Sequence, residues 1–309
     1  MLAERPLAWV AAHLGSPVAS ATVLTGGVAS EMFLLRATSG REAVLRQLTL
    51  EPWRRFADGL LRREYAVQAM LQDTGVPAPV PIAVDPGGSE SGVPSLLMSR
   101  LPGHVDLVRA DDAYLAELAG LLVRLHRFRP PADSWPREYQ SWAFESKQVV
   151  PPWSSDDALY VDAFARLAEG RPAYRPTFLH RDYYPANVLW QDGTLTGLVD
   201  WVETSTGPAD LDVAHCASNL AGLHGAQVAL AFRQAYVDAG GVLEEDPEAS
   251  RYWQLLDLVG FLPDPAGRES GAVGSTITET WRANGRPDLT VDLTRRRRED
   301  LLRVILTGG

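Results

Sequence analysis

Cysteine is almost absent from this sequence, because Cys216 is the only one among 309 residues. A single cysteine excludes an intrachain disulfide framework and fits a reducing compartment. Long apolar runs are missing too, since no stretch reaches the length of about 18 residues that a transmembrane helix needs. We therefore expect neither a membrane span nor a membrane partner.

The N-terminal segment MLAERPLAWVAAHLGSPVASA ends in small residues, as secretory signal peptides do. Glu4 lies in the part that should be basic, and His13 and Pro17 interrupt the apolar run. We expect a short amphipathic helix here and a cytoplasmic protein.

Positive charge is in deficit, with 29 Lys and Arg against 39 Asp and Glu, which gives a formal net charge of −10. An acidic protein repels a nucleic-acid backbone unless it carries a local basic patch. The basic run Arg295–Arg298 is followed at once by Glu299, Asp300 and an apolar stretch. This pattern favours the solvated start of an amphipathic helix, so we expect no nucleic-acid partner. The sequence leaves the oligomeric state open.

The order of apolar patterns predicts two parts. Alternating and β-branched residues predict strands at 18–24, 32–37, 43–48, 82–84 and 95–98, and a helical pattern covers about 53–72. After the connector LPGH the chain turns helical, with helices at 111–127 and 156–169, a loop-rich stretch at 130–156 and helices to the end. The predicted fold class is α+β: a small antiparallel sheet with one helix in an N-terminal lobe (1–100), and a larger, mainly α-helical C-terminal lobe (101–309).

Polar residues gather in the segment HRDYYPANVLW at 180–190. Asp182 precedes Asn187 by five positions, and thirteen more lead to Asp200 through the hairpin pattern VLWQDGTLTGLV. Because a hairpin brings its two ends together, we expect Asn187 and Asp200 side by side. Oxygen ligands held at one point suit Mg²⁺. Asp182 is then free to meet a substrate hydroxyl.

The spacing HxDxxxxN, followed by GLVDW at 197–201 and GPADLDVAH at 207–215, resembles the aminoglycoside phosphotransferase family of the kinase-like fold. Members of that family typically read HGDxHPGNVLW, GVIDW and GDPxxDLA. The resemblance extends over most of the chain, from position 20 to position 260. It implies a two-lobed protein-kinase-like fold and Mg²⁺-dependent transfer of phosphate from ATP, or GTP, to a hydroxyl of a small molecule.

The resemblance also implies roles for individual residues. Asp182 would accept the hydroxyl proton, while Asn187 and Asp200 would hold the metal. Asp212 would hydrogen-bond the backbone of the catalytic loop (residues 180–187), and His180 would support that loop.

Nucleotide contacts are implied for three segments. VLR at 44–46 and LRREYAVQAML at 61–71 correspond to the strand and helix that supply a phosphate-binding cation and its glutamate. TGGVAS at 25–30 corresponds to the nucleotide loop, and LLMSRLPG at 96–103 to the hinge that holds adenine. The implied nucleotide-binding residues are Gly26, Gly27, Ser30, Arg46, Glu64, Met98, Ser99 and Leu101.

Four positions depart from the kinase or family pattern. Arg46 stands in place of the lysine of protein kinases, and an arginine there keeps the charge but is bulkier. Arg181, Tyr184 and Ala186 stand where the family often has glycine, histidine and glycine. These departures leave the acceptor open: an aminoglycoside-like antibiotic, a macrolide, a choline-like alcohol or a sugar.

Other interpretations make different predictions. A nucleotide-binding regulator without activity would not need Asp182, Asn187 and Asp200 intact. A metal-dependent phosphoesterase would leave the glycine loop and the pair Arg46–Glu64 without a purpose. We expect His126 and His215 to be helix-packing residues, because no metal-site spacing surrounds them.

Overall fold

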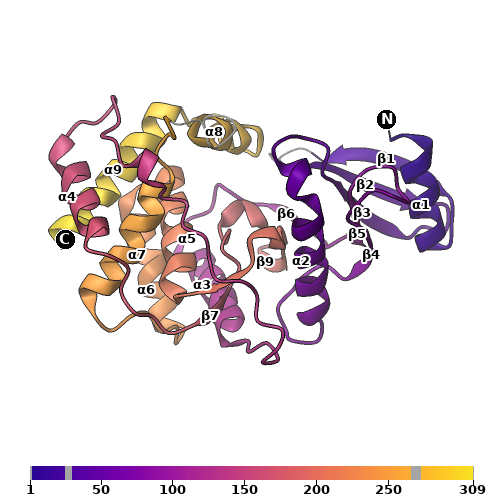
Figure 1. The fold of residues 1–309 in the computed structure, drawn as a ribbon, viewed down its shortest axis with the longest axis horizontal. Helices are drawn as coiled ribbons and strands as arrows, with labels where there is room; N and C mark the ends of the chain where they lie inside the picture. Colours follow the sequence, from indigo (N-terminus) through magenta and orange to yellow (C-terminus); the bar gives the residue numbers. More distant parts are fainter. Residues whose placement is uncertain (1, 25–29, 266–272, 309) are drawn as a thin grey trace. The chain divides into compact units, whose positions relative to one another are not determined.

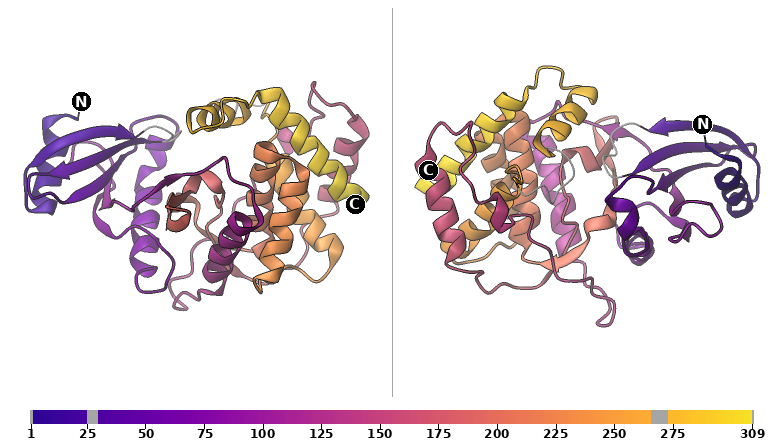
Figure 2. Two further views of the ribbon diagram at one scale, coloured as in Figure 1. Left: turned by 180° about the vertical axis from the view of Figure 1, so that it is seen from behind. Right: turned by 45° about the horizontal axis from the view of Figure 1, so that its top comes forward.

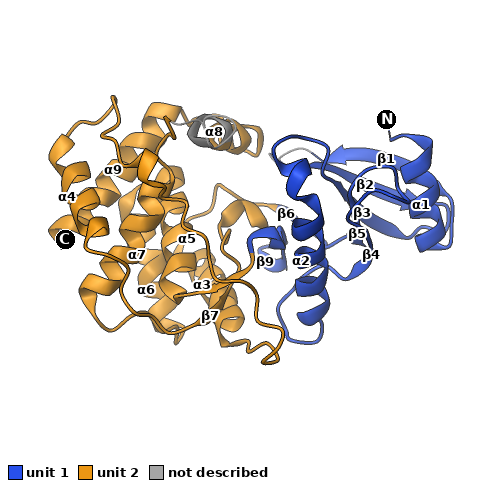
Figure 3. Cartoon of the chain, in the orientation of Figure 1, with its two compact units in different colours: residues 1–104, 189–203 blue, residues 105–188, 204–309 orange. Residues whose placement is uncertain are grey.

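The structure, a computed structural model, describes residues 2–24, 30–265 and 273–308 (Figure 1). Contacts divide it into two compact units, residues 1–104 with 189–203 and residues 105–188 with 204–309 (Figure 3). The predicted α+β class is confirmed, since the five-stranded sheet precedes a mainly helical remainder. The structure groups the segment 189–203 with the first unit; the division into domains at residue 100 stays a prediction.

The first unit is built on one antiparallel sheet with the strand order β1-β2-β3-β5-β4. Val44 lies opposite Leu34 on one side and Met98 on the other, and Arg46 lies opposite Leu96. Because side chains alternate between faces along a strand, Val44 and Arg46 share one face. The strands are β1 (Val18–Leu24), β2 (Glu31–Ala37), β3 (Glu42–Gln47), β4 (Pro81–Asp85) and β5 (Ser95–Ser99).

Helices pack on both faces of this sheet. Trp9 and Val10 of α1 (Glu4–Leu14) join the cluster with Leu45, while Leu61 of α2 (Ala57–Met70) joins the cluster with Met98 (Figure 1). The sequence predicted one helix against the sheet; the N-terminal amphipathic helix, also predicted, covers the second face. A 3₁₀ helix, η1 (Trp53–Phe56), precedes α2.

The hairpin after the catalytic loop forms as predicted. Strands β8 (Val188–Gln191) and β9 (Thr194–Leu198) are joined by Asp192 and Gly193, whose φ angles are 51° and 77°. Positive φ at both turn residues is the type I′ geometry that matches the twist of paired strands. These strands form a small sheet with β6 (His104–Val105), and η4 (Trp201–Glu203) follows Asp200.

The second unit is organised around α5 (Ala209–His224), which contacts α6, α7 and α9 (Figure 2). Its residues from Ala209 to Leu223 are all buried. A helix that is buried on every side has no solvent-facing polar face, so its polar residues are buried among its apolar ones; they are Asp210, Asp212, His215, Ser218 and Asn219. The other helices are α3 (Asp112–Arg127), α4 (Asp157–Ala168), α6 (Ala226–Asp238), α7 (Pro247–Gly260), α8 (Val273–Ala283) and α9 (Val291–Thr307).

Short elements frame the catalytic loop in this unit. Strand β7 (Thr177–Leu179) pairs with β10 (Ser205–Gly207) just before the loop, and η3 (Pro185–Asn187) ends the loop. The stretch 130–156 is mainly loop with one 3₁₀ helix, η2 (Glu145–Lys147). Within the described ranges, no helix is both long enough and apolar enough to cross a membrane.

We predict that Leu45→Ala lowers the free energy of unfolding by about 2–5 kcal/mol, because Leu45 is 0% exposed between the sheet and α1 and its truncation leaves a cavity. Val23→Ala on β1 is the matched control; Val23 is 60% exposed, so about 0.5 kcal/mol or less is expected. Urea unfolding of both variants measures the difference. Equal losses would contradict the packing of α1 on this face.

Candidate active site

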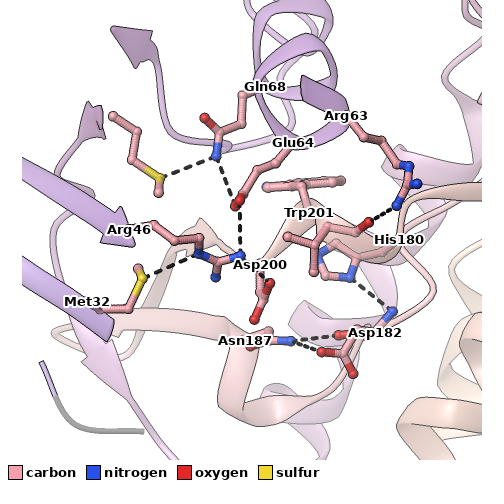
Figure 4. Close-up of polar contacts among 12 residues, drawn as sticks. Met32, Arg46, Arg63, Glu64, Gln68, His180, Asp182, Asn187, Asp200 and Trp201 are labelled. Carbon is pink, nitrogen blue, oxygen red and sulfur yellow. Dashed lines mark hydrogen bonds and ion pairs between the residues drawn. The ribbon is translucent and has the colours of Figure 1, made fainter. Parts of the chain in front are cut away.

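Arg46 lies at the centre of a buried charge cluster in the first unit. Its Nη1 atom is 3.0 Å from Oε2 of Glu64 and 2.9 Å from Oδ1 of Asp200 (Figure 4). The strand β3 directs Arg46 toward α2, and Glu64 lies on the facing side of that helix. The side chains of Arg46, Glu64 and Asp200 are 7%, 1% and 32% exposed, so only Asp200 meets solvent appreciably.

The pKa values of this cluster follow from burial and mutual charge. Burial raises the pKa of Glu64, and although the charge of Arg46 lowers it, the pKa settles at about 7. Burial lowers the pKa of Arg46, but the charges of Asp200 and Glu64 outweigh that effect and raise it. Arg46 therefore stays a cation, and its partner Glu64 changes charge near neutral pH.

Neighbouring side chains hold this cluster in place. Gln68, one turn after Glu64 on α2, contacts Oε1 of Glu64 at 3.4 Å and Sδ of Met98 at 3.3 Å. Nε of Arg46 donates to Sδ of Met32 at 3.3 Å (Figure 4). Nε and Nη1 are engaged in this way, which makes Nη2 the candidate donor to a ligand.

Four other residues that are expected to bind the nucleotide lie on or next to the strands β5 and β2. Met98 and Ser99 are on β5, where Met98 is buried and Oγ of Ser99 accepts the backbone N–H of Val80 at 2.8 Å. Leu101 follows that strand, and Ser30 is buried just before β2. Gly26 and Gly27 lie outside the described residues. Nucleotide binding by all of these positions stays a prediction.

Asp212 anchors the catalytic loop, as predicted. Its carboxylate accepts the backbone N–H groups of His180 at 2.8 Å and Arg181 at 2.7 Å. Nε2 of His126 on α3 lies 3.2 Å from the same carboxylate, so His126 does more than pack between helices. Burial raises the pKa of Asp212, but the hydrogen bond and charge of His126 outweigh burial and lower it below its ordinary value.

Asn187 and His180 fix the geometry of Asp182 within the loop. Nδ2 of Asn187 donates to the backbone oxygen of Asp182 at 2.8 Å and to its Oδ2 at 2.9 Å (Figure 4). The backbone N–H of Asp182 donates to Nδ1 of His180 at 3.3 Å, which confirms the supporting role expected of that histidine. The Asp182 side chain remains 26% exposed.

His215 on α5 contacts Asp182 directly. Its Nε2 is 3.0 Å from Oδ1 of Asp182, and its Nδ1 is 3.0 Å from Oδ1 of Asp257 on α7. The prediction of a purely packing role is therefore wrong. A signal was present in the sequence: Asp212 and His215 are three residues apart, and residues at this spacing share one face of a helix.

The two carboxylates control the charge of this histidine. Burial lowers the pKa of His215, but the charge of Asp257 and the hydrogen bonds with Asp182 and Asp257 raise it to about 9. Burial likewise raises the pKa of Asp182, and the hydrogen bond and charge of His215 outweigh it and hold that pKa below its usual value. Asp182 is thus an ionised carboxylate beside an imidazolium.

The backbone of Arg181 is left-handed, with φ of 72°. Glycine adopts this conformation without steric cost, whereas an arginine in it carries backbone strain. Arg181 compensates through its side chain: the guanidinium carbon lies 3.8 Å from the ring centre of Trp142, and Nη1 lies 3.6 Å from Asp257.

Each of the two predicted metal ligands, Asn187 and Asp200, has an oxygen atom that can bind a magnesium ion. Asn187 uses Nδ2 toward Asp182, so its amide oxygen is the atom that it can offer to a metal; Asp200 uses Oδ1 toward Arg46, so Oδ2 is the atom that it can offer. Both are the hard oxygen donors that Mg²⁺ prefers. Among the residues described, no group of three or more His, Cys, Asp and Glu has the geometry of a metal site. That Asn187 and Asp200 share one ion stays a prediction.

This chain resembles known phosphotransferases in sequence. The sequence profile of the "Phosphotransferase enzyme family" matches residues 20–253. Homoserine kinase of Mesorhizobium japonicum is 28% identical over 160 residues, 47% of this chain and 49% of that one. Homoserine kinase of Rhodopseudomonas palustris is 30% identical over 203 residues, 62% of this chain and 60% of that one. The chain thus matches only 49% and 60% of the lengths of these relatives.

A solved structure shares the fold. It is a thermostable mutant of aminoglycoside phosphotransferase APH(4)-Ia in a ternary complex with ADP and hygromycin B, with a TM-score of 0.58 over 96% of this chain and 97% of that one. The sequences are 18% identical. The likeness confirms the predicted protein-kinase-like fold class.

We predict that stability falls as pH rises from about 6.5 to about 9. The pKa of His215 is raised in the folded chain from 6.5 to about 9. Its contribution to the free energy of unfolding is therefore complete below a pH of about 6.5 and is lost as the pH passes about 9. The loss should be ~3 kcal/mol, and His215→Gln should lack it. Urea unfolding at several pH values measures this. The same pH dependence in both proteins would contradict the raised pKa.

We predict that Arg181→Gly destabilises the protein. Glycine removes roughly 1–2 kcal/mol of left-handed strain. The change also deletes a buried cation whose contact with Trp142 contributes about 2 kcal/mol, and it takes a positive partner from Asp257, a loss worth roughly 3–5 kcal/mol. The losses exceed the gain, so the midpoint of thermal unfolding should decrease. An unchanged or higher midpoint would show that strain dominates at this position.

Proposed function

This chain belongs to the phosphotransferase enzyme family, and on that premise we propose that it moves the γ-phosphate of ATP to a hydroxyl of a small molecule in a Mg²⁺-dependent reaction. The family match at 20–253 includes Arg46, Glu64, the catalytic loop and Asp200. The observation that carries the proposal is the state of Asp182: an ionised, partly exposed carboxylate held by Asn187 and His215.

Asp182 is the proposed base. An acceptor hydroxyl that donates a hydrogen bond to this carboxylate loses its proton to it as the new O–P bond forms and the bond to the leaving nucleotide breaks. ATP and the alcohol thus become ADP and a phosphate ester, with the proton on Asp182. The contacts of both carboxylate oxygens orient the group before the acceptor arrives.

Neutralisation of the charge on the phosphates is the second requirement of such a transfer. We assign Nη2 of Arg46 to the α- and β-phosphates, with Glu64 fixing the guanidinium. The amide oxygen of Asn187 and Oδ2 of Asp200 would hold Mg²⁺, which when bound neutralises and orients the transferred phosphate.

The nucleotide itself is assigned from the segments described above. The backbone at Met98, Ser99 and Leu101 would hold the base, and the loop with Gly26, Gly27 and Ser30 would cover the phosphates. ADP is bound in the APH(4)-Ia complex, which supports ATP as the donor here, with GTP as the alternative.

The acceptor is proposed as a small hydroxyl compound. Two relatives are homoserine kinases and one structural neighbour binds hygromycin B, so both a metabolic alcohol and an antibiotic are within the chemistry of the fold. The homoserine kinases are related by sequence, which favours a small metabolic alcohol and a cytoplasmic, metabolic role over antibiotic resistance.

We predict that Asp182→Asn lowers kcat for Mg²⁺-dependent ADP release by about 10²–10⁴-fold, because it removes the proton acceptor. The assay uses ATP with L-homoserine, hygromycin B and a panel of alcohols. Asp162→Asn on α4 is the matched control, since the Asp162 side chain is 47% exposed and its carboxylate pairs with Arg166 on the same helix. We expect it to match the wild type.

Two results would contradict the assignment. Equal rates for Asp182→Asn and the wild type would remove Asp182 as the base. A wild-type protein that binds ATP but releases no ADP with any acceptor would favour a nucleotide-binding regulator.

A further inference from the structure

We propose that His215 is a positioning residue for Asp182: as a cation between two carboxylates, it holds the Asp182 side chain in one orientation toward the acceptor hydroxyl. The inference rests on the proposed function, because it assigns a role within the same site. None of the roles implied by sequence resemblance involves this residue or Asp257.

The two carboxylate contacts favour a doubly protonated imidazole. Each ring nitrogen lies 3.0 Å from a carboxylate oxygen, of Asp182 on one side and Asp257 on the other. An ionised carboxylate only accepts hydrogen bonds, so both nitrogens carry protons. The raised pKa of His215, about 9, agrees with this arrangement. The Asn219 amide, 3.2 Å from Nε2, carries no net charge and donates to the backbone oxygen of His215 at 2.9 Å.

Other charges near this pair make Asp182 the partner that depends on His215. Asp257 also has Arg181 at 3.6 Å and interacts electrostatically with Arg298, so it retains two cations without the histidine. For Asp182 the hydrogen bond and charge of His215 are the strongest effects that lower its pKa. Removing His215 therefore leaves Asp257 with positive partners and takes the principal one from Asp182.

Aromatic rings hold the imidazole in place. Phe261 stacks on it, with ring centres 5.5 Å apart and planes inclined by 12°. Trp142 and Tyr184 meet it edge-on, with ring centres at 5.3 and 5.8 Å. The His215 side chain is 5% exposed, so it has little freedom to rotate and its hydrogen bond to Asp182 is fixed in direction.

This arrangement acts on the orientation of the base. Asn187 holds Oδ2 of Asp182 while His215 holds Oδ1, so neither torsion of the aspartate side chain is free. Prior orientation of this kind lowers the barrier, and an error of about 1 Å in a reacting group costs roughly 10²-fold in rate. The hydroxyl proton goes to Asp182, the O–P bonds form and break as described above, and the imidazolium keeps both protons throughout.

The kinetic test compares His215→Gln with the wild type, using Mg²⁺ and ATP with L-homoserine or hygromycin B as acceptor. We expect kcat to fall about 10²-fold while KM for ATP changes less than about twofold, because orientation is lost but nucleotide contacts are kept. His224→Gln on the same helix is the matched control and should leave both constants unchanged. Wild-type kcat in His215→Gln would overturn the proposal, as would a rise in KM for ATP that accounts for the whole loss.

Nitrogen-15 NMR of histidine-labelled full-length protein tests the contacts of His215 with Asp182 and Asp257 without reference to activity. At neutral pH both nitrogens of His215 should show the shifts of an imidazolium, and Asp257→Asn should move its titration to lower pH. A neutral His215 in the wild type would overturn the proposal. If the wild type releases no ADP, the proposed function fails, and the NMR result still decides whether a charged His215 holds the side chain of Asp182. Should His215→Gln fail to fold, the kinetic comparison passes to Asp257→Asn, where wild-type kcat would overturn the proposal.

Discussion

The catalytic loop depends on one carboxylate. Asp212 accepts the backbone N–H groups of His180 and Arg181, and the second of these residues is left-handed. A non-glycine residue in that conformation costs roughly 1–2 kcal/mol. Hydrogen bonds to a charged group contribute about 1.5–3 kcal/mol each, so the two together exceed the strain. The turn they stabilise sets the direction of Asp182, and from it follow the contacts of that side chain with Asn187 and His215.

Buried charge is handled differently in the first unit, where Arg46 meets Glu64 and Asp200. A buried ion pair gains little net stability against its desolvation, so its presence here argues for a purpose other than folding. Arginine suits the position better than lysine, because the planar guanidinium reaches the carboxylates with Nη1 and Met32 with Nε at once. A lysine has a single nitrogen on a flexible stem and could not make these contacts together. The departure from the kinase pattern at position 46 is thus matched by its surroundings.

Local patterns in the sequence predicted most of the fold. Alternation along β2 and β3 predicted strands, and Asp192–Gly193 predicted the hairpin, because both features follow from the geometry of neighbouring residues. The anchoring role of Asp212 could be inferred only through resemblance. His215 and Asp257 are 42 positions apart, and their contact depends on how α5 packs against α7, which no local pattern contains. The left-handed backbone of Arg181 could not be predicted from the sequence for a related reason. Arginine disfavours this conformation, and the partner that stabilises it, Asp257, is distant in the sequence.

One face of α5 anchors both the backbone of the catalytic loop and the side chain of Asp182. Asp212 holds the backbone of the catalytic loop, and His215, three residues later, holds the side chain that the loop presents. The helix is itself buried among α6, α7 and α9, and close-packed interiors resist small displacements. A shift of α5 would move Asp212 and His215 in the same direction, so the backbone and the side chain of Asp182 would keep their relative positions. Changes at positions 212 and 215 should therefore not combine additively, since each anchor works only while the other keeps the loop in reach.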